Sequence, residues 1–284
     1  MTPTLVQHHP SAASAPTGTR ARDWAEIQER MLVPLYDAVY ERLEVGPATR
    51  LLGLDCGAGL ALFVAASRGA RVAGVDTDLA RLALARTRLR TGGAPGAQTE
   101  GRDAGAAVVR GGPSAAADTD AAPYNLVTAF EPIGCAAGDT DGLTPALSEA
   151  VALVGRGSAV VLTGWGPPER CATSAVLRVA SRLTDTLRTS GGWRPTLRDD
   201  LEDVAARAGL TPDGSGRVAC PFGYGDMDSA VRGLLSTGLY DAAVRATDPA
   251  QVEKELVEAL HPHLRADGTV WMPNVFRYLI ARKP

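Results

Sequence analysis

The chain has 284 residues, of which 45% are hydrophobic, and its 29 basic and 32 acidic side chains leave a formal net charge of −3. This length is enough for one large core, and the slight acidity argues against a protein organised around a basic nucleic-acid-binding face. No run of 18 or more apolar residues occurs, so neither a transmembrane helix nor a membrane partner is predicted.

The first 20 residues are rich in Thr, Ser, Ala and Pro and lack the apolar segment of a signal peptide. We expect residues 1–20 to be a disordered tail and residues 21–284 to form a single domain. Apolar residues at helical spacing, from Trp24 to Leu35, predict helices within 22–45. Pro34 should split this stretch into two shorter helices.

The next segment is the most informative one. An apolar strand over 49–55 ends in Asp55 and is followed by Gly57 and Gly59, which lead into a helix over 60–68. A second strand over 71–76 ends in Asp76. Glycines allow the backbone to approach a ligand closely, and an acid after the second strand can accept hydrogen bonds from ribose hydroxyls. The pattern predicts a nucleotide-like cofactor.

Two cofactor classes fit this pattern. The dinucleotide motif G-x-G-x-x-G needs a third glycine or alanine, but this chain has Leu62 at that position. Asp55 would repel a pyrophosphate and would suit a ligand with positive charge, such as the ammonium and sulfonium of S-adenosylmethionine. The charge argument favours S-adenosylmethionine over NAD(P), and a glycine turn with no ligand remains the structural alternative.

Alternating strands and helices continue along the chain and predict a doubly wound α/β sheet with right-handed crossovers. A helix is expected from Asp78, with Arg81, Arg86, Arg88 and Arg90 on a solvated face. The other elements expected in the first half are a strand over 98–101, a loose loop over 104–122, a strand over 124–130, a helix over 144–154 and a strand over 158–163.

The second half is less regular. A segment of about 45 residues separates two predicted strands, near 217–220 and over 270–281, and we expect this insertion, 221–268, to fold as a cap over the carboxyl edge of the sheet. Helices are predicted over 169–187, 198–208, 227–235 and 249–260.

Taken together, these segments resemble the class I S-adenosylmethionine-dependent methyltransferases. The Asp55-x-Gly57-x-Gly59-x-Ala61 turn resembles the family's first motif, Asp76 matches its ribose-binding acid, and Gly101-Arg102-Asp103-Ala104 resembles the segment after its third strand. Asn125 stands where the family commonly has Asp. The resemblance implies a doubly wound, mostly parallel seven-stranded sheet with an antiparallel last strand, here with a helical cap. It also implies S-adenosyl-L-methionine as cofactor, held by Tyr36, Asp55, Cys56, Gly57, Gly59, Asp76, Thr77, Asp103, Ala104 and Phe130.

Residues beyond the fourth and fifth strands, in the lid helices and in the cap are the candidates for contact with the acceptor: Trp24, Glu131, Trp165, Tyr224 and His261. A catalytic base cannot be assigned from the sequence. Cys56, Cys135, Cys171 and Cys220 lack the spacing of a zinc site and are expected to be buried thiols in a reducing cytoplasm, so no metal is predicted.

The resemblance implies methyl transfer to a small-molecule acceptor, by in-line displacement. The Arg-, Ala- and Gly-rich composition suggests a high-GC bacterial genome, and with it natural product biosynthesis in bacterial specialised metabolism. Two alternatives remain open: a non-methylating cyclase that uses the same fold and cofactor, and an NAD(P)-linked oxidoreductase. The sequence is compatible with a monomer or a homodimer.

Overall fold

A computed structural model describes residues 17–91, 106–117, 122–184 and 193–284. Seven strands form one sheet in the order β3-β2-β1-β4-β5-β9-β6. The first five are parallel, and β9 runs antiparallel to both of its neighbours, β5 and β6. This confirms the predicted doubly wound sheet. The strands are β1 (Arg50–Leu54), β2 (Arg71–Asp76), β3 (Ala106–Arg110), β4 (Tyr124–Ile133), β5 (Val154–Trp165), β6 (Thr211–Ala219) and β9 (Val275–Arg282).

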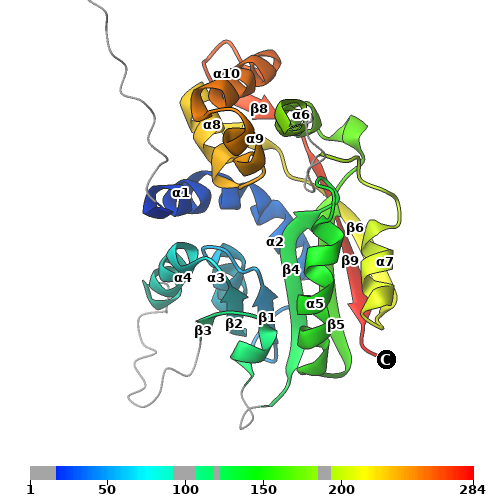
Figure 1. Ribbon diagram of the computed structural model, residues 1–284. Helices are drawn as coiled ribbons and strands as arrows, with labels where there is room; N and C mark the ends of the chain where they lie inside the picture. Colours follow the sequence, from blue (N-terminus) through cyan, green and yellow to red (C-terminus); the bar gives the residue numbers. More distant parts are fainter. Residues whose placement is uncertain (1–16, 92–105, 118–121, 185–192) are drawn as a thin grey trace, which may run out of the picture.

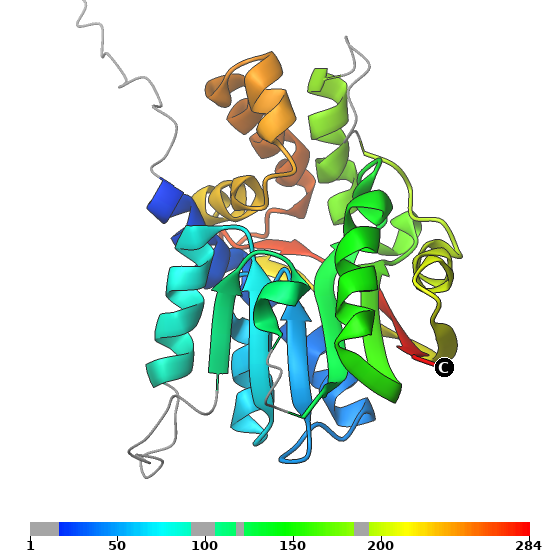
Figure 2. The ribbon, with the colours of Figure 1, turned by 60° about the horizontal axis from the view of Figure 1, so that its bottom comes forward.

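Helices cover both faces of this sheet (Figures 1 and 2). The strands are apolar on both sides, so successive residues enter opposite cores: Leu51 packs with one hydrophobic cluster and Leu52 with the other. The first cluster includes α2 (Val33–Arg42), α3 (Leu60–Ser67) and α4 (Leu79–Thr91), and the second includes α5 (Asp139–Ala152) and α7 (Asp200–Arg207).

A cap lies over the carboxyl edge of the sheet (Figure 1). Strands β7 (Phe222–Tyr224) and β8 (Val270–Met272) pair with each other outside the main sheet. Between them the chain forms α8 (Met227–Ser236), α9 (Asp241–Ala246), α10 (Pro249–Leu260) and a short turn of 3₁₀ helix, η5 (His261–His263). Helices α9 and α10 pack against α6 (Thr173–Thr184). The predicted helical cap is therefore present.

The amino-terminal segment runs between the cap and the sheet. It consists of α1 (Thr17–Asp23), a π-helical turn η1 (Trp24–Gln28), a 3₁₀ turn η2 (Glu29–Leu32) and α2, with Pro34 in the first turn of α2. The helical prediction for 22–45 and the break near Pro34 agree with these elements. However, α1 begins inside the predicted tail, and residues 1–16 lie outside the described residues.

The third strand was predicted in the wrong place. It spans Ala106–Arg110, within the segment expected to be a loop, and a 3₁₀ turn η3 (Pro113–Ala116) follows it. Alanine has low strand propensity, but the strand pairs with β2 from Val72 to Asp76 and its Val108 carbonyl accepts hydrogen bonds from Arg86. The expected strand over 98–101 lies outside the described residues.

The single last strand predicted over 270–281 is also wrong, because it is divided between two sheets. Pro273 has no N–H to contribute to a ladder, and the buried Asn274 breaks the run. The Asn274 side chain accepts from the amide of Thr173 at 3.2 Å and donates to the Met272 carbonyl at 3.2 Å. These bonds tie the junction of β8 and β9 to the start of α6.

We predict that Gly74→Ala is destabilising although it adds only one methyl group. A Cβ at Gly74 would lie 2.5 Å from Leu62 Cδ1 and 2.8 Å from Cys56 Sγ, beneath the glycine turn. Overpacking of this kind costs about 1–3 kcal/mol. Gly142→Ala is the matched control: it lies in α5 with nothing within 4 Å of its Cβ position, and it should stabilise by about 0.5–1 kcal/mol. Urea denaturation of both variants measures the difference, and equal stabilities would contradict the packing argument.

Candidate functional site

The glycine turn joins the carboxyl end of β1 to α3. Three of its residues have left-handed backbone, with φ of 45° at Asp55, 56° at Gly57 and 77° at Gly59. Asp is one of the few residues with a side chain that tolerates this region. A Cβ at Gly59 would lie 2.9 Å from the Cβ of Ala85, so the glycine also allows α3 and α4 to approach each other.

The Asp76 carboxylate, at the end of β2, holds this turn through hydrogen bonds to backbone amides. It is 5% exposed, its Oδ2 accepts the Gly57 N–H at 2.8 Å, and its Oδ1 accepts the Asp78 N–H at 2.8 Å. The sequence prediction assigned this carboxylate to a ribose. In the structure both oxygens bind backbone amides, so Asp76 shapes the turn, and its contact with a ligand stays a prediction. Thr77, which follows it, is exposed.

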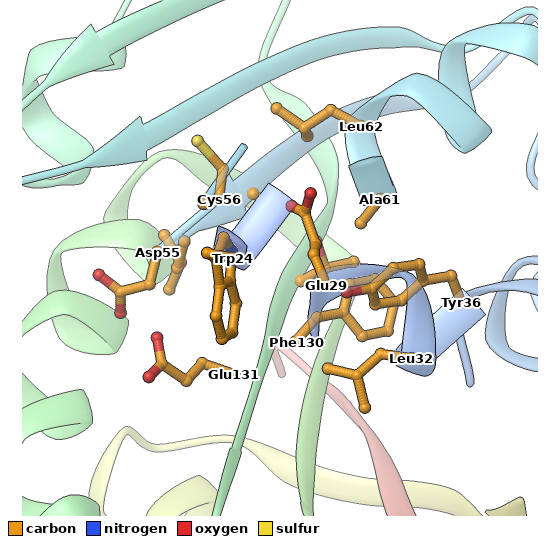
Figure 3. A pocket seen from close by; sticks show the side chains of 14 residues that line it. Trp24, Glu29, Leu32, Tyr36, Asp55, Cys56, Ala61, Leu62, Phe130 and Glu131 are labelled. Atoms are coloured by element: carbon orange, nitrogen blue, oxygen red, sulfur yellow. The ribbon is translucent and has the colours of Figure 1, made fainter. Parts of the chain in front are cut away.

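A small cavity lies between the turn and the amino-terminal segment (Figure 3). Its volume is about 30 Å³, enough for roughly one or two water molecules. Its lining combines the carboxyl ends of β1 and β4, the start of α3 and the amino-terminal segment: Trp24, Glu29, Leu32, Tyr36, Gly53, Leu54, Asp55, Cys56, Gly57, Ala61, Leu62, Thr128, Phe130 and Glu131.

The side chains of Trp24 and Glu29, from the amino-terminal segment, limit the volume of this cavity next to Gly57. A Cβ at Gly57 would lie 3.0 Å from Trp24 Nε1 and 3.2 Å from Glu29 Oε1. Trp24 Nε1 is buried and has no hydrogen-bond partner among the described residues. Sites for drug-sized ligands measure about 300–1,000 Å³. A nucleotide-sized ligand can therefore enter only if this part of the amino-terminal segment moves away.

Two arginines on α4 hold the amino-terminal segment in place. Arg88 Nη1 lies 2.6 Å from Glu29 Oε2 and 2.6 Å from the Ala58 carbonyl, while Glu29 Oε1 accepts the Leu60 N–H at 3.2 Å. The Arg81 guanidinium lies 4.3 Å from the centre of the Trp24 ring and donates to the Ser236 carbonyl in the cap at 3.1 Å.

The prediction that these arginines form a solvated face is wrong for Arg81 and Arg88, which are partly buried against other elements. Arg86 is exposed as predicted, although it also donates to the Val108 carbonyl. Helical spacing shows which residues share a face, but not that a neighbouring segment covers it. Glu29 was missed for the same reason. It is 3% exposed, and only its position among apolar neighbours on one helical stretch could have indicated burial.

The predicted aromatic contacts fall into two groups. Tyr36 and Phe130 pack against each other with ring centres 4.8 Å apart and line the cavity. Burial raises the pKa of Tyr36, which favours its neutral phenol. Trp165 instead packs on Phe276, with ring centres 4.6 Å apart, at the base of the cap.

Two further candidates lie outside the cavity lining. The Tyr224 hydroxyl is buried and donates to Gln28 Oε1 at 3.0 Å, so Tyr224 ties the cap to the amino-terminal segment. His261 is exposed at the end of α10. The structure thus brings together Trp24, Tyr36, Asp55, Cys56, Gly57, Phe130 and Glu131, and leaves Trp165, Tyr224 and His261 outside this lining.

Asp103 and Ala104, predicted beside an adenine, lie outside the described residues. The prediction placed them after the third strand, but β3 begins at Ala106, so they precede it. Their order relative to the third strand was therefore predicted wrongly, while their contact with an adenine stays a prediction. The segment that follows β3 begins at Gly111, whose amide donates to the Asp76 carbonyl at 3.1 Å.

The residue types around the turn fit the predicted cofactor. Gly57 gives close access to the backbone, Trp24 Nε1 is a donor without a partner among the described residues, and Asp55 and Glu131 are carboxylates at the rim of the cavity. These groups suit a ligand with both hydrogen-bonding and cationic parts. Among the residues that the structure describes, no group of three or more His, Cys, Asp or Glu is arranged to hold a metal ion. Within the same ranges, no helix is long and apolar enough to cross a bilayer.

Solved structures share this architecture. A candidate methyltransferase from Bacillus halodurans superposes with a TM-score of 0.53 at 14% identity, covering 88% of this chain and 98% of that one. YjhP from E. coli gives 0.52 at 16% identity, with 92% and 98% covered. YcgJ from Bacillus subtilis gives 0.52 at 13% identity, with 87% and 97% covered. No protein-family model matches the sequence, and no curated protein is significantly similar to it. The similarity in structure establishes the class I methyltransferase fold.

We predict that Arg88→Ala destabilises the protein strongly. It would leave the Glu29 carboxylate, with a side chain 4% exposed, without its cation. Burial already raises the pKa of Glu29 against the influence of Arg88. Breaking a buried pair from one side costs about 3–5 kcal/mol, and because Arg88 is partly exposed we expect a loss of about 3 kcal/mol.

Lys254→Ala is the control for this experiment. Lys254 pairs with Glu258 on α10 at 3.9 Å, but both side chains are more than 60% exposed, at 68% and 62%. Surface pairs of this kind contribute about 0–1 kcal/mol. Thermal or urea unfolding compares the two variants. A similar small loss for both would show that Glu29 and Arg88 do not hold the segment.

Proposed function

We propose that this protein is an enzyme that transfers a methyl group from S-adenosylmethionine to a small-molecule acceptor. The observation that supports this most directly is the turn itself. Asp55, Gly57 and Gly59 lie at the carboxyl end of β1, at the centre of a sheet with the class I methyltransferase order, where ligands of open α/β sheets bind. The fold alone does not assign an activity, so the proposal depends on these residues.

The cofactor supplies an electrophilic methyl group that is already activated, so the chain has mainly to bind, orient and exclude water. Gly57 gives access to the backbone, Phe130 and Tyr36 form an apolar wall, and Trp24 covers the site from the amino-terminal segment. Alignment of two reactants in one site can lower a barrier by about 7–11 kcal/mol in favourable cases.

The cap supports a small acceptor. Tyr224 binds Gln28, Arg81 binds Ser236, and Trp165 packs on Phe222, so the cap, the amino-terminal segment and the sheet edge meet above the turn. A macromolecular acceptor would need an open approach to this edge. The net charge of −3 also favours a small molecule over a nucleic acid. We place the enzyme in bacterial specialised metabolism on the composition of the chain.

Calorimetry with S-adenosylmethionine tests the cofactor, with Gly57→Ala as the informative variant. The added Cβ would project into the cavity that Gly57 lines, where we propose that the ligand approaches the backbone, so we expect affinity to fall at least about tenfold, as for the loss of more than ~1.4 kcal/mol. Gly157→Ala is the control, since Gly157 has a similar left-handed φ of 76° and nothing within 4 Å of its Cβ position. Unchanged affinity in the Gly57 variant would refute the close approach.

The reaction is tested with S-adenosylmethionine labelled in its methyl group and a small-molecule extract from bacteria rich in specialised metabolites. We expect label in the small-molecule fraction and an equal amount of S-adenosylhomocysteine. Binding of S-adenosylmethionine without release of S-adenosylhomocysteine during substrate conversion would instead favour a non-methylating cyclase. Tight binding of NADH and none of S-adenosylmethionine would favour the oxidoreductase alternative.

A further inference from the structure

Two carboxylates of the cavity have no hydrogen-bond or ion-pair partner among the described residues. Glu29 is bound by Arg88 and the Leu60 amide, and Asp76, just beneath the turn, is bound by two backbone amides. In contrast, Asp55 and Glu131 make no side-chain hydrogen bond or ion pair within the described ranges, and both are exposed at the rim. The left-handed backbone at Asp55 favours an Asp there, but no hydrogen bond among the described residues accounts for either carboxylate.

The sheet places these two side chains on the same edge. Asp55 follows β1, Glu131 comes near the end of β4, and the two strands are neighbours, with Leu54 paired to Ala129. Figure 3 shows both carboxylates on one side of the Trp24 ring, with the Glu29 carboxylate on the other side. Charge therefore gathers on one wall of the cavity, next to an aromatic face.

No cationic side chain of the described residues lines this wall. Among the described residues that line the cavity there is no Lys, Arg or His, while three are acids: Glu29, Asp55 and Glu131. The cation that acts on both of these carboxylates is Arg81, which lies over the Trp24 ring and donates to the Ser236 carbonyl. Its position shows that the Trp24 ring can bind a cation.

Glu131 also titrates close to neutrality. Protein packed round its carboxyl raises its pKa to about 7, although water still reaches the side chain; Arg81 opposes this rise, while Asp55 and Asp76 add to it. Burial likewise raises the pKa of Asp55, with Asp76 adding to the effect and Arg81 opposing it. The other ionisable groups nearby are Glu29, Tyr36 and Cys56 in the lining, and Cys135, whose pKa is raised by burial and by Asp139 and Glu131.

We propose that Asp55 and Glu131 together are the counter-charge for the sulfonium of the cofactor, so that the site distinguishes S-adenosylmethionine from its neutral product S-adenosylhomocysteine. This inference rests on the proposed function. The sulfonium is attracted to two carboxylates and an aromatic face. After transfer the sulfur is a neutral thioether, so the attraction is lost and the product leaves more readily. Protonation of Glu131 removes half of the counter-charge, so the discrimination weakens in acid.

The test measures the dissociation constants of S-adenosylmethionine and S-adenosylhomocysteine by calorimetry at pH 6 and pH 8. The quantity of interest is the preference for the charged ligand, the ratio of the two constants. With a pKa of about 7, the ionised fraction of Glu131 rises from roughly one tenth at pH 6 to nine tenths at pH 8. Because only the ionised carboxylate attracts the sulfonium, the preference should rise by about fivefold to tenfold.

The variants isolate the two carboxylates. Glu131→Gln should abolish the rise in this preference between pH 6 and pH 8. The ligands themselves titrate equally with both proteins, so comparison with this variant removes their contribution to the pH dependence. Asp55→Asn should lower the preference at both pH values by about fivefold. Glu253→Gln, an exposed acid on α10, is the control and should behave as the wild type.

The outcomes separate this inference from the proposed function. Equal preference in the wild type and in Glu131→Gln at both pH values, with both ligands bound, would overturn the counter-charge role and leave the cofactor assignment intact. Absence of binding for both ligands would overturn the proposed function itself. Circular dichroism of each variant confirms that an altered preference does not arise from loss of fold.

Discussion

The hydrogen bond from the Gly57 amide to Asp76 is the constraint on which the site depends. A left-handed turn at the centre of the sheet exposes backbone amides, and Asp76 binds the one at Gly57 while its other oxygen holds the Asp78 amide at the approach to α4. One buried carboxylate thus joins the ends of β1 and β2. Because the position of α4 follows from it, so do the positions of Arg81 and Arg88, which hold the amino-terminal segment.

The amino-terminal segment and the cap act as one cover. Glu29 is fixed to α4 by Arg88, Trp24 is fixed by Arg81, and Gln28 and Ser236 carry these contacts into the cap. The segment from Trp24 to Leu32 is a π turn followed by a 3₁₀ turn rather than regular α-helix. Irregular helical turns of this kind often mark hinges. Ligand entry and release would therefore involve the Glu29–Arg88 ion pair and the Arg81–Trp24 contact, which hold the segment down.

Burial and hydrogen bonding divide the acids of the site into two sets with different roles. Asp76 and Glu29 are buried and fully bound, and they organise the chain. Asp55 and Glu131 are open to water and unpaired within the described residues, and they are available to a ligand. An acid that is buried with its partners loses its hydration but not its hydrogen bonds, whereas an exposed acid can meet a cation without first breaking a contact.

The local pattern of the sequence determined the sheet, the glycine turn and the edge where ligands bind. Glycine spacing and apolar runs act over a few residues, so strands β1, β2, β4 and β5 and the helix from Asp78 were predicted near their observed positions. Prediction failed for β3, where the strand is made mostly of alanine and valine and is stabilised by pairing with β2 and by Arg86. It failed again at Pro273, where one apolar run serves two sheets.

Only the tertiary structure decided which polar residues meet. Glu29 and Arg88 are 59 positions apart, and Gln28 and Tyr224 are 196 apart, so no periodicity connects them. The same holds for Asp55 and Glu131, whose nearness follows from the pairing of β1 with β4. The sequence by itself determined that a carboxylate follows the first strand. The fold decided that a second one stands beside it, because strand order, unlike strand identity, is set by packing across the whole sheet.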